Sequence, residues 1–136
     1  MEIKACQKSP TFGTKFERID FAEVKKLLGD KEEQTILAAR RQLMRMFDDT
    51  VEISMRAKNN FLSNDNSLKI IVRKTLGDIG DMTYDMECSF KLKNNSLFKK
   101  GITTQNIIKG VKNIFKKRKV KQQIKIFDRL KAKEKN

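Results

Sequence analysis

The sequence predicts an α+β fold: a small antiparallel sheet of three or four strands, covered on one face by helices, with a long basic C-terminal helix. Two observations carry this prediction. Apolar residues recur every three or four positions in some segments, as in helices, and alternate with polar residues in others, as in half-buried strands. In chain order these segments give β-α-α-β-β-β-α, and 136 residues are enough to bury one core.

We divide the chain into three parts. Residues 1–16 form an N-terminal strand or arm, residues 17–118 form the α+β core domain, and residues 119–136 form a basic amphipathic extension. A weak alternation around Ile3 and Ala5 indicates a short strand, which Pro10 and Gly13 bring to an end.

Two helices are expected next. Asp20 is placed as the N-cap of the first, with Glu23 three residues later in a capping-box arrangement. Gly29 ends this helix, and Asp30 follows as the expected N-cap of the second. The second helix carries an apolar stripe made of Ile36, Ala39, Leu43, Met46 and Phe47.

The spacing of the apolar residues then changes to every second position. Residues 51–57 alternate as a half-buried strand, and a polar loop is expected over residues 58–67. An antiparallel hairpin follows over residues 68–73 and 82–92, with its turn at residues 77–81. Centring this turn on Ile79 places Leu68 opposite Phe90, and Arg73 opposite Asp85 as an ion pair. In this register Tyr84 and Cys88 belong to the core, and no cluster of Arg or Lys is expected on the strands.

The pattern of the last part of the chain predicts a helix whose apolar residues move to another side at its basic centre. Thr103 is a suitable N-cap, and an apolar stripe from Ile107 to Phe115 faces the core. Beyond Lys119 the apolar residues fall on another side of the helix. We therefore expect either a kink or break within residues 116–119, or a second stripe that faces a different partner.

Charge is concentrated in the same region. Residues 99–136 hold 14 Lys and Arg residues against two acidic ones, which accounts for +12 of the net charge of +14. Such a segment suits a polyanion, because bound phosphates relieve its repulsion and release counterions. We predict a non-enzymatic nucleic-acid-binding protein that prefers RNA to DNA, although a basic amphipathic helix also suits an anionic membrane surface. The expected phosphate contacts are Lys99, Lys100, Lys112, Lys116, Lys117, Arg118, Lys119, Lys121 and Lys125.

Two alternatives remain open. The first is a protein-interaction or oligomerisation module, a homodimer included, whose partner-binding stripe consists of Val120, Ile124, Phe127 and Leu130. The second starts from element order. Residues 31–118 resemble the α-β-β-β-α order of the double-stranded-RNA-binding domain, and residues 1–92 resemble the order of the RelE/ParE toxin superfamily. The latter resemblance implies a ribosome-dependent endoribonuclease.

Other classes are excluded by composition. The chain contains no histidine, so Ser-His-Asp and Cys-His catalysis and zincin sites are impossible. Cys6 and Cys88 form no CxxC motif, and we interpret both as reduced thiols of a cytoplasmic protein. No catalytic residue, metal site or cofactor is predicted, and no apolar run is long enough for a transmembrane segment.

Overall fold

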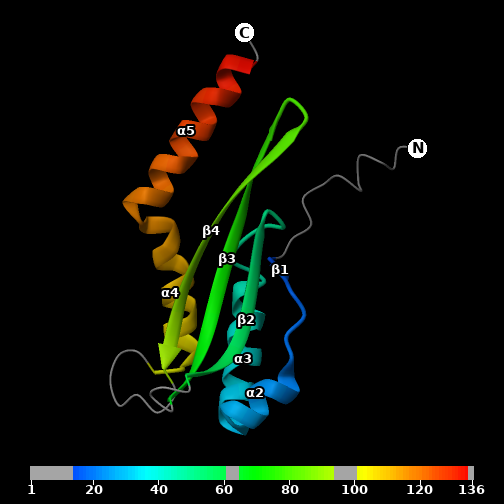
Figure 1. Cartoon of the computed structure of the whole chain (residues 1–136), viewed down its shortest axis with the longest axis vertical. Helices are drawn as coiled ribbons and strands as arrows, with labels where there is room; N and C mark the ends of the chain where they lie inside the picture. The colour runs from blue at the N-terminus through cyan, green and yellow to red at the C-terminus, as the bar shows by residue number, and fades with distance from the viewer. Residues whose placement is uncertain (1–13, 61–64, 94–100, 135–136) are drawn as a thin grey trace, which may run out of the picture.

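The computed structural model describes residues 14–60, 65–93 and 101–134, and within them it forms one mixed four-stranded sheet (Figure 1). The strands lie in the order β1-β2-β3-β4. Strand β1 pairs in parallel with β2, whereas the other neighbours are antiparallel. The strands are β1 (Lys15–Phe16), β2 (Val51–Asn60), β3 (Asp65–Ile79) and β4 (Met82–Lys93). The strand expected around Ile3 and Ala5 lies outside the described residues.

Helices cover one face of this sheet, which confirms the predicted α+β class (Figure 1). They are α2 (Phe21–Leu27), α3 (Asp30–Leu43), α4 (Thr104–Lys116) and α5 (Arg118–Glu134). The core lies between the inner face of the sheet and helices α3 and α4. Its most deeply buried aliphatic side chains are Val24, Ile36, Leu43, Ile53, Leu68, Ile70, Ile107, Val111 and Ile114. Burying each of these contributes about 1.5–3 kcal/mol.

The helix starts follow the predicted capping chemistry at two places and depart from it at one. The carboxylate of Asp20 accepts a hydrogen bond from the Glu23 N–H (3.1 Å), and the hydroxyl of Thr103 accepts one from the Asn106 N–H (3.0 Å). The prediction that Asp30 caps α3 is wrong. Gly29, with a φ of 116°, ends α2 and is itself the N-cap of α3, so that Asp30 is already the first helical residue.

The polar loop expected over residues 58–67 is also wrong, because most of these residues continue the β2–β3 ladder. Asn59 is paired with Asn66, and their side-chain amides are joined by a hydrogen bond of 2.8 Å. The Asn66 amide also donates to the carbonyl of Leu27 at 2.6 Å. The amide side chains therefore join neighbouring elements, and their polarity does not mark a loop.

The β3–β4 hairpin forms with a register shifted by two residues from the predicted one. Leu68 lies opposite Leu92 and Arg73 lies opposite Glu87, where Phe90 and Asp85 were expected. The turn is tight at Gly80, whose φ is 62°, and a bulge follows Thr75. A shift of two residues leaves each side chain on its predicted face but gives it new neighbours.

The far end of this hairpin extends beyond β2, and this explains why one predicted core residue is exposed. The last pair between β2 and β3 is Val51 with Lys74, so among the described residues no third strand pairs with the hairpin beyond that point. Cys88 is half-buried against the core, whereas Tyr84 is 37% exposed. The placement of Tyr84 in the core is therefore wrong. Helix α5 is the element that contacts β3 near this end.

Helix α4 approaches the sheet closely at Gly110. A Cβ atom at this position would lie 2.4 Å from the ring of Phe90, so we expect Gly110→Ala to destabilise the fold. Alanine favours the helix by about 1 kcal/mol, but overpacking costs about 1–3 kcal/mol. Urea unfolding should show the net loss. In a Phe90→Leu background the clash is relieved, so the same substitution should be neutral or stabilising. A rise in stability from Gly110→Ala alone would contradict this account.

Candidate functional site

Helices α4 and α5 are separated by a single residue, Lys117, whose backbone is extended (φ −65°, ψ 138°). The Lys117 N–H donates to the carbonyl of Ile114 (3.2 Å) and closes α4. Its own carbonyl accepts from the N–H of Lys121 (3.1 Å) in the first turn of α5. Of the two expected alternatives, the structure shows the break, which allows the apolar sides of the two helices to face different parts of the molecule.

Helix α5 packs on the far end of the hairpin through Phe127. The ring of Phe127 lies 6.0 Å from that of Tyr84, centroid to centroid, and a Cβ atom at Gly77 would come within 3.2 Å of it. Gly77 has a φ of 138°, which favours glycine, so the backbone itself forms the surface that receives the ring. One turn further on, the Lys131 ammonium donates to the carbonyl of Asp78.

This packing places the predicted partner-binding stripe against the chain's own hairpin. Val120 is 1% exposed, Phe127 is 8% exposed, and Ile124 is partly buried against the core. Leu130 is 46% exposed, and the neighbouring Ile126 is 54% exposed. Of the four stripe residues, only Leu130 presents a large apolar surface to solvent.

The opposite side of α5 carries a row of cations at every fourth position. Lys121, Lys125, Arg129 and Lys133 are all exposed, and we call these four residues the α5 ridge. Residues four apart lie one above another on a helix, so the ridge is about 18 Å long. Within the part of the chain that the structure describes, no ion pair joins any of them. Like charges at this spacing destabilise a helix unless an anion binds.

The basic surface continues along α4. Lys109, Lys112 and Lys116 line a shallow groove with Gln42 of α3, and the junction between the helices adds further exposed cations. Among the predicted contacts, the exposed ones are Lys112, Lys116, Lys117, Arg118, Lys119, Lys121 and Lys125. Lys99 and Lys100 lie outside the described residues. The prediction omitted Lys109, Arg129 and Lys133, although the four-residue spacing would have identified the last two.

The face of the sheet that turns away from the helices carries two rows of charged side chains. In the first, Arg73 on β3 lies between Glu52 on β2 (3.2 Å) and Glu87 on β4 (2.8 Å). The hydrogen bond to Glu87, with the charges of Glu87, Glu52 and Asp85, raises the pKa of Arg73 above its usual value. This row is compensated within the fold.

The second row contains only cations. Arg56 on β2 lies opposite Lys69 on β3, which lies opposite Lys91 on β4. Two residues further along the strands, on the same face, Lys58 and Lys93 lie on either side of Ser67. This cluster could not be predicted from the sequence, because it depends on the register of all three strands.

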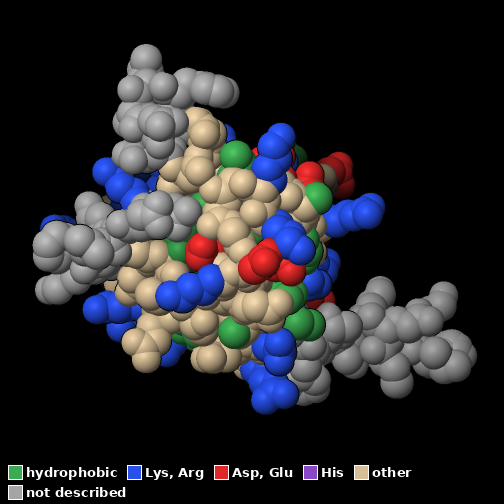
Figure 2. Space-filling view, turned by 90° about the horizontal axis from the view of Figure 1, so that it is seen from below, with side chains coloured by type: hydrophobic (Ala, Val, Ile, Leu, Met, Phe, Trp, Pro, Cys, Tyr) green, Lys and Arg blue, Asp and Glu red, His purple; other side chains and the backbone are tan. Residues whose placement is uncertain are grey.

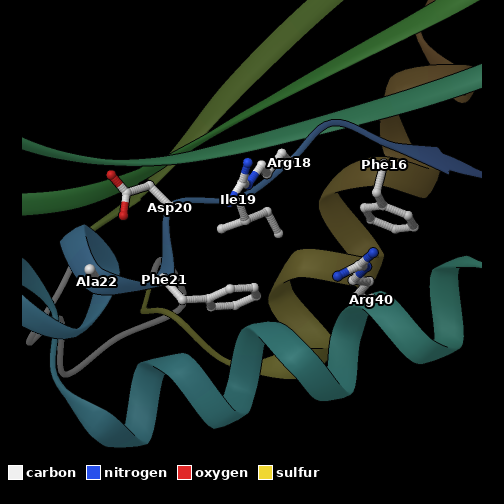
Figure 3. A pocket seen from close by; sticks show the side chains of 7 residues that line it. All are labelled: Phe16, Arg18, Ile19, Asp20, Phe21, Ala22 and Arg40. Atoms are coloured by element: carbon white, nitrogen blue, oxygen red, sulfur yellow. The ribbon is translucent and has the colours of Figure 1, made fainter.

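A groove of about 930 Å³ lies between the segment that leads into α2 and helix α3 (Figure 3). Arg40 of α3 places its guanidinium 5.3 Å from the centre of the Phe16 ring, which holds β1 against the helix. The carboxylate in this groove, Asp20, is engaged in capping α2. The groove therefore brings together no acid–base pair.

Acidic side chains are mixed with basic ones elsewhere on the surface. Seen from the end opposite to α5, Lys and Arg lie around the outline with acidic side chains between them (Figure 2). Among the described residues, no cluster of Cys, Asp and Glu is arranged to hold a metal ion. In the same part of the chain, no helix is long and apolar enough to cross a membrane.

Comparisons of the chain with protein-family models, with curated proteins and with solved structures found no match. The candidate site is therefore defined by its geometry: a basic surface on α4 and α5, and a second group of cations on the open face of the sheet.

The docking of α5 can be tested with two neighbouring residues. We expect Phe127→Ala to lower the free energy of unfolding by about 3 kcal/mol, because it removes a buried ring. It should also speed cleavage of α5 by trypsin, measured by mass spectrometry. Ile126→Ala is the matched control, and its exposed side chain should contribute less than about 0.5 kcal/mol. Equal effects of the two substitutions would contradict the packing described above.

Proposed function

We propose that this protein binds nucleic acid without catalysing a reaction, that it prefers single-stranded RNA to DNA, and that phosphates contact the α5 ridge and the basic residues of α4. The observation that carries the proposal is the ridge itself. Its four cations are exposed, evenly spaced and unpaired within the described residues, while the other side of the same helix is fixed on the hairpin.

Electrostatics supplies the driving force. Each cation of the ridge lies about 6 Å along the helix axis from the next, well within the Debye length of about 8 Å at physiological ionic strength. Their mutual repulsion is therefore only partly screened. A phosphate backbone lying along the helix relieves it and releases counterions.

The burial of Phe127 and Val120 favours nucleic acid over a membrane. An amphipathic helix binds a bilayer by inserting its apolar side among the lipids. In α5 most of that side lies on the hairpin, and only Ile126 and Leu130 keep a large exposed apolar surface. The same burial removes most of the stripe that a protein partner would have used.

The shape of the basic surface favours a flexible strand. Helices α4 and α5 are inclined to one another at Lys117, so the cations follow a bent path (Figure 1). Duplex DNA is stiff, with a persistence length of about 150 base pairs, and bending it costs free energy. Single-stranded RNA follows such a path at little cost.

Base recognition contributes little to this mode of binding. The chain has no Trp, and the ring of its one Tyr, Tyr84, packs beside Phe127. Stacking platforms for bases are therefore scarce along the helices. We expect binding that depends on salt and changes little with sequence.

The salt dependence provides the test. For single strands, the slope of log K against log salt is about −0.7 for each phosphate contact, so Lys121→Gln/Lys125→Gln/Arg129→Gln should reduce its magnitude by about two. Binding to oligouridylate, followed by fluorescence anisotropy over a range of salt concentrations, measures this slope. Oligothymidylate and duplex DNA, titrated in parallel, report the preference for RNA.

The matched control removes three charges from the other end of the molecule. Lys25, Lys26 and Lys31 are exposed on α2 and the start of α3, and their replacement by Gln gives the same net charge. This variant should keep the wild-type slope. A ridge variant that also keeps the wild-type slope would refute the proposed function. If both variants lose slope equally, binding depends on net charge and not on the position of the ridge.

A further inference from the structure

We propose that the open face of the sheet provides a second phosphate-binding surface for the same single-stranded nucleic acid. The surface consists of Arg56, Lys58, Lys69, Lys91 and Lys93, which we call the sheet patch. This inference rests on the proposed function and extends it. The strand that follows α4 and α5 would pass over the edge of β4 and reach the other face of the sheet.

The sheet patch is fixed by backbone pairing. Arg56, Lys69 and Lys91 are consecutive cross-strand neighbours, so hydrogen-bonded ladders hold the three Cα atoms in one row. Lys58 and Lys93 belong to the next row on the same face, two residues along their strands. The patch is therefore a rigid array in two dimensions.

Repulsion within this array is substantial. Neighbouring strands lie about 4.8 Å apart and rows on one face about 6.7 Å apart, both distances being shorter than the Debye length of about 8 Å. Like charges placed directly opposite each other destabilise a sheet. The closest acidic contact is that of Glu17 with Arg56, at 3.9 Å, and no ion pair involves Lys69 or Lys91 among the described residues.

The other charged row of the same face provides an internal comparison. Arg73 is held between Glu52 and Glu87 at 3.2 and 2.8 Å, so the fold can compensate charge on this face. Four residues along the strands, the positions that correspond to Glu52 and Glu87 are Arg56 and Lys91. Apart from the contact of Arg56 with Glu17, no ion pair among the described residues compensates this row, and an external anion would supply the missing charge.

The chemistry of the patch selects among anionic partners. Protein interfaces centre on buried apolar and aromatic anchors. Between the two charged rows the open face offers only Ile71, flanked by Ser54 and Ser89. A planar anionic bilayer can contact one face of the sheet, whereas the α5 ridge belongs to the helical side. A flexible polyanion can contact both.

The path between the two surfaces crosses β4. This strand is the last in the sheet order, and in the described fold its outer edge meets another segment only at an isolated bridge between Lys93 and Gly101. Helix α4 lies against the inner face of β4, where Gly110 meets the ring of Phe90. Lys91 and Lys93 stand on the outer face of the same strand. The shortest connection from the helices to the patch therefore leads over this edge.

The experiment compares a short oligouridylate, of about six nucleotides, with one of about 30 nucleotides, because single-strand sites span roughly 4–16 nucleotides. The patch variant is Lys69→Gln/Lys91→Gln/Lys93→Gln. We expect it to bind the short RNA within about twofold of wild type, since either surface alone can hold it. With the long RNA, its salt slope should fall in magnitude by about two, and its gain in affinity with length should be lost.

Two further variants separate the possible causes. Lys69→Arg/Lys91→Arg/Lys93→Arg keeps the charges and should bind both RNAs as wild type does. Lys25→Gln/Lys26→Gln/Lys31→Gln removes three charges elsewhere and should keep the gain with length. The urea midpoint of the patch variant at low salt should equal or exceed that of wild type, because repulsion has been relieved. A loss of binding would then not reflect unfolding.

The outcomes distinguish this inference from the proposed function. If the patch variant keeps the wild-type slope and length dependence while the ridge variant loses affinity, the sheet patch binds no RNA and only the inference fails. If wild type binds neither RNA, the proposed function fails and the inference with it. A long-RNA slope that falls in the patch variant and is restored by the arginine variant supports the inference.

Discussion

The far end of the β3–β4 hairpin needs another element to pack on it and shield its apolar side chains from water. Much of the candidate site depends on which element does so. A two-stranded ribbon is marginally stable in water unless a third strand or a helix packs on it. The pairing of β2 with β3 ends at Val51 and Lys74, so β2 cannot pack on the hairpin beyond Lys74. Helix α5 contacts β3 there, with Phe127 against Gly77 and Tyr84.

This packing determines the direction in which the cations of α5 point. For α5 to reach the hairpin while α4 remains on the core, the helix has to break, and it does so at Lys117. With Phe127 and Val120 fixed inward, helical geometry sends Lys125 and Arg129 outward. The orientation of the α5 ridge is thus a result of packing, and its cations are held along one line in the absence of any ligand.

Much of the fold was predictable from local signals. The N-caps at Asp20 and Thr103 are chemical patterns within one turn of a helix, and both are confirmed. The change of apolar side at residues 116–119 correctly predicted the break at Lys117. Local polarity was a poor guide where side chains bond across elements. Asn66 looked like a loop residue, yet it joins β3 to β2 and to α2.

The exposed basic residues of α4 and α5 were predictable because helical spacing can be read from the sequence. The sheet patch was not. In the predicted register Lys69 lies opposite Ser89, and no two cations face each other on β3 and β4. The tight turn at Gly80 and the bulge after Thr75 together shift the pairing by two residues and bring Lys91 opposite Lys69.

A shift of two residues leaves the core unchanged, because each side chain stays on its face. Burial therefore cannot distinguish the two registers. The turn and the bulge distinguish them, because both registers place an acidic residue opposite Arg73: Asp85 in the predicted register and Glu87 in the observed one. The observed register also sets Lys69 against Lys91, and this pair destabilises the sheet. The observed pairing thus compensates Arg73 within the fold, whereas Lys69 and Lys91 have no ion-pair partner among the described residues.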